Sequence, residues 1–243
     1  MISENVKVVK FGGSSLADAG QFRKVIEIIR ADESRRYVIP SAPGKRFPGD
    51  DKITDLLYRC YEAATSKSGE FDAIYAKITD RYRTIIRELD LDFSLEDDFS
   101  SIQYAIQHKA GRDFAASRGE YLNAKILAKA LGYYFLDAAE VIFFREDGSF
   151  DAERTNKVLK QRLSGIECAV IPGFYGSMPN DTIRTFSRGG SDITGSITAR
   201  AVDADLYENW TDVSGCLMAD PRVVDHPRVI ETITYTELRE LSY

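Results

Sequence analysis

Two stretches of sequence decide the fold of this 243-residue chain: Lys10-Phe11-Gly12-Gly13-Ser14 and Ser187-Arg188-Gly189-Gly190-Ser191-Asp192. In each stretch, glycines stand between a predicted strand and a predicted helix, where they let the backbone approach a ligand closely. The first turn of the following helix then offers free N–H groups to an anion. Lys10 adds a compact charge suited to phosphate, and Arg188 adds a planar fork suited to carboxylate. The two junctions together predict a site that handles phosphate and carboxylate at once.

Strand-like apolar runs alternate with helix-like patterns around these junctions. The predicted strands cover residues 7–11, 37–40, 133–136, 141–144, 167–172, 182–186 and 206–210, and the predicted helices cover 21–30, 53–64, 71–89, 96–109, 114–131, 153–163 and 193–202. This alternation predicts an α/β fold, a three-layer αβα sandwich with a mostly parallel central sheet. Because ligands bind at the carboxyl ends of parallel strands, we expect both junctions at that edge. The charged loop at 44–52 is interpreted as a solvated insertion, with a lid as the alternative.

Composition excludes several classes of protein. The chain is 44% hydrophobic and 29% charged, which is typical of a globular protein, and its net charge of −6 argues against a nucleic-acid surface. No apolar run reaches the ~20 residues that a membrane span needs, and the first residues show no signal-peptide pattern. The three widely spaced cysteines indicate reduced thiols in a cytoplasmic protein. The two histidines have no ligand-spaced partner, so we expect no dedicated metal site.

A series of short motifs resembles the amino-acid kinase family, and within it the aspartate kinases. In chain order the motifs are Lys-Phe-Gly-Gly-Ser at 10–14, Ser-Ala-Pro-Gly at 41–44, Arg-Gly-Glu-Tyr-Leu-Asn-Ala at 118–124, Pro-Gly-Phe-Tyr-Gly at 172–176, Arg-Gly-Gly-Ser-Asp at 188–192, Trp-Thr-Asp-Val-Ser-Gly at 210–215 and Asp-Pro-Arg-Val-Val at 220–224. Any single motif is weak, but the ordered set is specific. The resemblance implies one catalytic domain over 1–243, with a substrate lobe at about 1–165 and an ATP lobe at about 166–243.

The resemblance implies a reaction and its machinery. The γ-phosphoryl group of ATP, carried with Mg²⁺, would pass to the side-chain carboxylate of L-aspartate, on the route to lysine, threonine and methionine. That carboxylate is already ionised at pH 7, so no general base is needed. By the same resemblance Lys10 neutralises the transferring phosphoryl oxygens and Asp192 orients Lys10. The aspartate pocket would comprise Ser41, Thr54, Glu120, Phe174, Arg188 and Ser191, and the nucleotide site would comprise Gly12, Gly13, Ser14, Thr211, Asp212, Asp220 and Arg222.

Two of these assignments carry open alternatives. Glu120 is expected on the polar face of a long helix, either as a solvated charge or as the partner of the substrate ammonium group. Leu217-Met218 stands where relatives have tyrosine and then threonine, so we expect ATP binding to be weaker by about 1 kcal/mol for a missing hydrogen bond.

The family pattern continues past Tyr243 with Phe-Gly-Ala-Lys and small regulatory domains. We therefore expect a catalytic domain without its regulatory domains, which binds aspartate but phosphorylates it poorly. The alternatives are another small-carboxylate or carbamate kinase of the same fold, or a non-catalytic amino-acid-binding paralogue. Lys10 and Asp192 favour an enzyme. The expected ligands are L-aspartate and ATP, with neither nucleic acid nor membrane as a partner, and a homodimer remains an open alternative.

Overall fold

The computed structural model describes residues 5–187, 189–211, 215, 217–220 and 223–234. It comprises two compact units, Met1–Trp210 and Thr211–Tyr243, and each is considered by itself. In the first unit, five strands form a wholly parallel sheet in the order β3-β4-β2-β1-β7. Their bounds are β1 Lys7–Phe11, β2 Arg35–Pro40, β3 Tyr134–Phe135, β4 Ala169–Val170 and β7 Leu206–Trp210.

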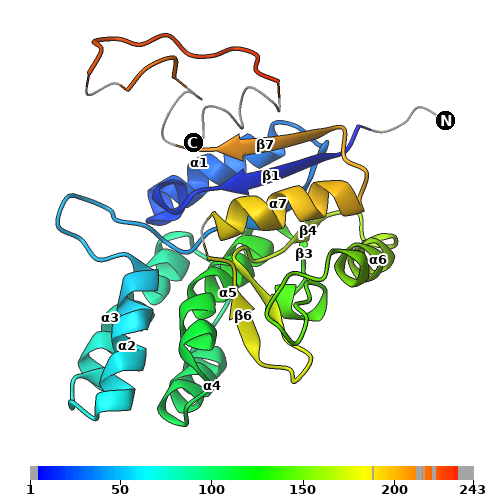
Figure 1. Cartoon of the computed structure of the whole chain (residues 1–243). Helices are drawn as coiled ribbons and strands as arrows, with labels where there is room; N and C mark the ends of the chain where they lie inside the picture. Colours follow the sequence, from blue (N-terminus) through cyan, green and yellow to red (C-terminus); the bar gives the residue numbers. More distant parts are fainter. Residues whose placement is uncertain (1–4, 188, 212–214, 216, 221–222, 235–243) are drawn as a thin grey trace. The chain divides into compact units, whose positions relative to one another are not determined.

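Helices cover both faces of this sheet (Figure 1). They are α1 (Ala19–Arg30), α2 (Ile53–Ser66), α3 (Phe71–Glu88), α4 (Glu96–Gln107), α5 (Arg112–Leu131), α6 (Ala152–Leu163) and α7 (Gly190–Ala201), with short 3-10 turns η1 (Gly13–Leu16) and η2 (Ala138–Glu140). The three-layer αβα sandwich predicted from the sequence is thereby confirmed. None of the described helices combines the length and the apolar composition that crossing a membrane requires.

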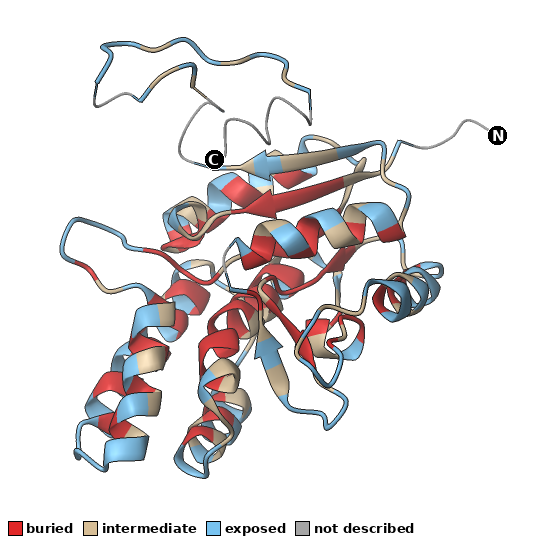
Figure 2. Cartoon of the chain, viewed as in Figure 1, coloured by how far each residue is buried: buried red, intermediate tan, exposed pale blue. Residues whose placement is uncertain are grey.

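Strand alternation divides the interior into two apolar cores. Val9 of β1 packs with α1 to α5 on one face, whereas Val8 belongs to the core formed with α6 and α7 on the other face. Successive strand residues point to opposite faces of a sheet, so one buried strand supplies both cores. Figure 2 shows β1 buried along most of its length and α7 with one buried and one exposed side.

The sequence prediction errs at two short segments. Residues 141–144 were expected to form a strand, but Phe143 and Phe144 make only isolated bridges after η2. The structure adds β5 (Tyr175–Ser177), which pairs antiparallel with β6 (Ile183–Thr185). A three-residue strand that contains Gly176 leaves too little periodicity to be recognised locally. In the second unit, Leu217 bridges Val229, and the Met218 N–H donates to the Arg228 carbonyl at 2.9 Å.

Candidate active site

The two glycine junctions meet at the carboxyl ends of the parallel strands. Lys10 lies near the end of β1 and is only 8% exposed. Its Nζ atom is 2.9 Å from Oδ1 of Asp192, which lies in the first turn of α7. The structure thus brings together the two residues to which the family resemblance assigns the catalytic roles. A buried lysine that is paired with a carboxylate is fixed in position rather than free to sample solvent.

Asn209 is a residue of this arrangement that the sequence analysis did not identify. It lies on β7 in register with Lys10 of β1, and its Nδ2 donates to Asp192 Oδ1 at 2.9 Å. Tyr207 of the same strand donates from its hydroxyl to the Asp192 carbonyl at 3.4 Å. Asp192 is therefore held by β7 as well as by Lys10. The available sequence signal was a polar Asn next to the Trp210 motif, at the end of a strand.

The first glycine junction packs directly against the loop that follows β2. Gly12 donates its N–H to the Trp210 carbonyl at 3.2 Å, and Gly44 donates its N–H to the Gly13 carbonyl at 2.8 Å. A Cβ atom on Gly44 would lie 2.8 Å from the carbonyl carbon of Gly13, so glycine is required by close approach of two backbones. Ser14 is exposed, at the start of the η1 turn.

Glu120 contradicts its sequence-based placement on a polar helix face. The structure places it on a buried side of α5, 6% exposed, and its Oε2 has no hydrogen-bond partner in the described chain. Burial raises the pKa of its carboxyl group to about 8, although the backbone N–H of Ala42 offers partial compensation. The prediction erred because α5 contacts α2, α4 and the sheet, and therefore buries residues on several sides. A buried carboxyl group with an unpartnered oxygen would ionise and pair with a cationic ligand that entered this position.

Two neighbours on α5 fix the helix against the loop after β2. Gly119 allows close packing, because a Cβ atom there would lie 2.7 Å from the Cβ of Ala42. Asn123 donates from Nδ2 to the Ser41 carbonyl at 2.7 Å, and its Oδ1 has no partner in the described chain. Asn123 belongs to the motif at 118–124, but the family resemblance did not predict a role for it. Its spacing of one helical turn from Glu120 was the signal, since residues three apart share a face.

The other predicted aspartate-pocket residues lie around the same edge. Phe174 adopts a positive φ of 84° and donates its N–H to Thr194 Oγ1 of α7 at 3.1 Å. Ser191 is buried at the start of α7, next to Phe174's neighbour Gly173. Ser41 is half-buried and donates its N–H to the Phe11 carbonyl at 3.0 Å, while Thr54 is half-buried in the first turn of α2.

Several predicted residues cannot be placed at this edge. Arg188, Asp212 and Arg222 lie outside the described residues. Thr211 and Asp220 are exposed members of the second unit, which is described by itself. The nucleotide role of the segment 211–222 therefore stays a prediction, as does the division into lobes near residue 165.

The interpretation of loop 44–52 as a solvated insertion is wrong at Asp50. Residues 45–49 are exposed, but Asp50 is buried and paired with two arginines. The composition of the loop gives no sign that Asp50 is buried, because its buried partner Arg81 comes from α3, far along the chain. The burial of Asp50 anchors the end of the loop to the body of the domain.

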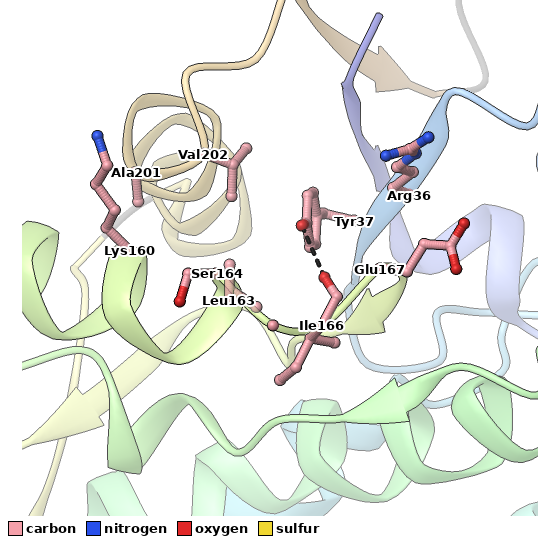
Figure 3. Close-up of a pocket in the computed structure, with 10 residues that line it drawn as sticks. Arg36, Tyr37, Lys160, Leu163, Ser164, Ile166, Glu167, Ala201 and Val202 are labelled. Atoms are coloured by element: carbon pink, nitrogen blue, oxygen red, sulfur yellow. Dashed lines mark hydrogen bonds between the residues drawn. The ribbon is translucent and has the colours of Figure 1, made fainter. Parts of the chain in front are cut away.

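A separate cavity lies at the opposite edge of the sheet, and Figure 3 shows the residues that line it. Its volume is about 510 Å³. It lies between the start of β2, the turn before β4 and the last turns of α6 and α7. The Tyr37 hydroxyl donates to the Ile166 carbonyl across it at 3.0 Å. None of the predicted site residues lines this cavity, so it is no part of the candidate active site.

Comparison with known proteins identifies the family of the chain. The model of the amino acid kinase family matches residues 5–243, and the chain belongs to that family. Within the family, the chain is similar to aspartate kinases. It is 37% identical to aspartokinase 3 of Bacillus subtilis over 253 residues, which cover 98% of the chain and 55% of that protein.

Solved structures give the same result. The crystal structure of Clostridium acetobutylicum aspartate kinase superposes with a TM-score of 0.93 at 54% identity, covering 98% of this chain and 55% of that one. E. coli aspartokinase III, in complex with aspartate and ADP, gives a TM-score of 0.82 at 25% identity, covering 98% of this chain and 56% of that one. The chain spans about half the length of the relatives it matches.

Proposed function

We propose that this chain is the catalytic domain of an aspartate kinase, transferring the γ-phosphoryl group of ATP to the side-chain carboxylate of L-aspartate. The observation that carries the proposal is the Lys10–Asp192 pair, formed where the two glycine junctions meet. Similarity to aspartate kinases, one of which binds aspartate and ADP, supports the choice of substrates. The pathway role and a cytoplasmic location are part of the same proposal.

Lys10 supplies the charge that phosphoryl transfer needs. The reaction depends on positioning and on neutralising charge that spreads over the phosphoryl oxygens. Asp192, itself held by Asn209, fixes the lysine ammonium group near the glycine turn. The Gly12 N–H donates to the Trp210 carbonyl, so Gly12 would serve the phosphates by allowing their close approach, while Gly13 and Ser14 would supply the backbone donors. The aspartate carboxylate attacks in its ionised form, so no side chain has to remove a proton.

Glu120 supplies the recognition of an amino-acid substrate. Its buried Oε2 has no hydrogen-bond partner in the described chain, and the ammonium group of aspartate would supply a donor to it once the carboxyl group ionises. Asn123, one turn later, presents a second unpartnered acceptor and holds Ser41 through the carbonyl of that residue. A simple carboxylate without an amino group would leave both acceptors without a partner, which costs binding energy.

The site is compatible with Mg²⁺ that enters bound to ATP. The metal would be held chiefly by phosphate oxygens and water, and it would neutralise the charge on the phosphates. Asp192 fits such an ion, because its carboxylate is an oxygen ligand with a side chain 43% exposed beside Lys10. The remaining steps rest on the chain's own residues, which orient the two substrates.

The experiment measures ADP release with L-aspartate, ATP and Mg²⁺ while hydroxylamine traps the acyl phosphate. We expect signal with aspartate, none with glutamate, and loss in Lys10→Ala. An ATP-dependent product from carbamate or another small carboxylate, with none from aspartate, would instead favour a related kinase. Binding of aspartate without turnover, unchanged in Lys10→Ala, would favour a non-catalytic paralogue.

A further inference from the structure

Arg81 of helix α3 is a buried arginine that the proposed mechanism does not use. It is 6% exposed, and its guanidinium group points to the loops at the carboxyl ends of β1 and β2. A buried arginine requires partners for its fork of donors. The partners of Arg81 are therefore informative about its purpose.

The guanidinium group bridges two loops that are distant in sequence. Nη1 donates to the Ala17 carbonyl at 3.3 Å and to the Gly44 carbonyl at 3.2 Å. Ala17 directly follows the η1 turn that begins at Gly13, and Gly44 belongs to the loop after β2. Nη1 of Arg81 therefore contacts both loops, next to the place where the Gly44 N–H donates to the Gly13 carbonyl.

The second nitrogen fixes the far end of the loop after β2. Nη2 donates to Asp50 Oδ2 at 2.8 Å and to the Asp51 carbonyl at 3.5 Å. Asp50 also accepts from Arg46 Nε at 2.8 Å, and these arginines hold the pKa of its carboxyl group well below the usual range. The ionised Asp50 in turn supplies the charge that lets Arg81 remain buried.

The loops that Arg81 joins carry the groups proposed to bind substrates. The glycine turn at 12–14 is proposed for ATP phosphates, and Ser41 for aspartate. Phosphoryl transfer depends on the separation and orientation of two bound substrates, and an error of about 1 Å costs rate steeply. A rigid planar fork that spans both loops sets their separation, and a lysine ammonium group cannot reproduce its geometry.

We propose that Arg81 is a positioning residue for phosphoryl transfer: with Asp50 as its counter-charge, it locks the glycine turn after β1 and the loop after β2 in fixed register. This inference rests on the proposed aspartate kinase activity. Arg81 is not among the residues proposed to bind either substrate, and it acts through the carbonyls of Ala17 and Gly44. Its loss is expected to lower kcat about 10-fold or more, with less effect on the KM for aspartate, because Glu120 lies on another helix.

The test compares Arg81→Lys with Arg83→Lys in the same chain. Arg83 is a matched control on α3, since its Nη2 lies 2.7 Å from Oε2 of the exposed Glu96 and touches neither loop. The kinetic measurement is kcat and KM for both substrates. The second measurement is amide hydrogen exchange in segments 12–17 and 41–51, with α5 as the internal reference, before and after addition of ATP and Mg²⁺.

We expect Arg81→Lys to lower kcat and to speed exchange in both segments by about 10-fold, with α5 unchanged, and Arg83→Lys to do neither. Parental kcat, faster exchange in every segment alike, or faster exchange in only one of the two loops overturns the inference. If Arg81→Lys does not fold, Asp50→Asn decides, since it removes the counter-charge and leaves the carbonyl partners in place. If the parent releases no ADP, the proposed function fails, and exchange in the two segments still decides whether Arg81 locks them.

Discussion

Lys10 Nζ lies 2.9 Å from Asp192 Oδ1, and Asn209 Nδ2 reaches the same oxygen at 2.9 Å. Strand β1, strand β7 and helix α7 therefore converge on one carboxylate oxygen. Because two donors share this acceptor, the orientation of the Asp192 carboxylate is fixed. The other N–H groups of the Lys10 ammonium stay available to a phosphate. The first predictions test this convergence.

Replacement of Lys10 by methionine should lower kcat by about 10²–10³-fold, because a positioned cation on the transferring phosphoryl group is lost. The hydroxylamine-trapped assay measures the change. Lys7→Met is the matched control, since Lys7 lies on the same strand and pairs with Asp32 at 2.7 Å, at the other end of β1. Equal activity in the two variants would contradict the role of Lys10.

Replacement of Asn209 by leucine should lower kcat about 10-fold and leave the KM for aspartate little changed. The variant removes one of the two donors that fix Asp192, but it leaves Lys10 and the pocket around Glu120 intact. Steady-state kinetics with each substrate varied in turn measure the change in kcat separately from the change in KM. A rise in the KM for aspartate at constant kcat would show that Asn209 acts elsewhere.

Glu120 should make the stability of the ligand-free chain depend on pH. The pKa of its carboxyl group rises from 4.5 to about 8 on folding, so the unfolded chain loses the proton first. The free energy of unfolding should therefore fall as pH rises from about 5 to about 8, by an amount on the order of a few kcal/mol, and Glu120→Gln should remove this part of the slope. Urea titrations at several pH values measure the difference between the two proteins. If the free energies of unfolding of the parent and of Glu120→Gln changed with pH in parallel, the shifted pKa of Glu120 would be contradicted.

Aspartate binding should release a proton near neutral pH. The ammonium group of aspartate favours the ionised form of Glu120, which is mostly protonated in the empty site at pH 7 because its pKa lies near 8. Calorimetric titrations in two buffers with different ionisation enthalpies measure the protons released. Heats that are independent of buffer would show that Glu120 is already ionised or does not meet the ammonium group.

Gly44→Ala should destabilise the chain by about 1–3 kcal/mol and weaken nucleotide binding, because the new methyl group would overlap Gly13. Gly165→Ala is the matched control, since a Cβ atom there meets nothing within 4 Å. Its effect on the free energy of unfolding should be small or slightly stabilising. Denaturant titration and ATP binding measure both variants, and equal effects would exclude the close approach as the cause.

Local pattern was sufficient for the layers of the fold but insufficient for the environment of the site. The strands at 7–11 and 206–210 match β1 and β7, because apolar runs between turn residues are local signals. Glu120 was misplaced on a polar face, because its burial depends on how α2, α4 and the sheet pack against α5. The anchoring of Asp50 was missed for the same reason, since its partner Arg81 lies on another element.

The sequence by itself determined an alternating α/β chain whose two glycine junctions carry Lys10 and Asp192, since periodicity and glycine turns are properties of neighbouring residues. Only the tertiary structure decided that the strands lie in the order β3-β4-β2-β1-β7. That order places Asn209 beside Lys10 and brings Asp192 to both. Pairing between distant strands and burial of single side chains depend on contacts that close long loops, and no local period encodes them.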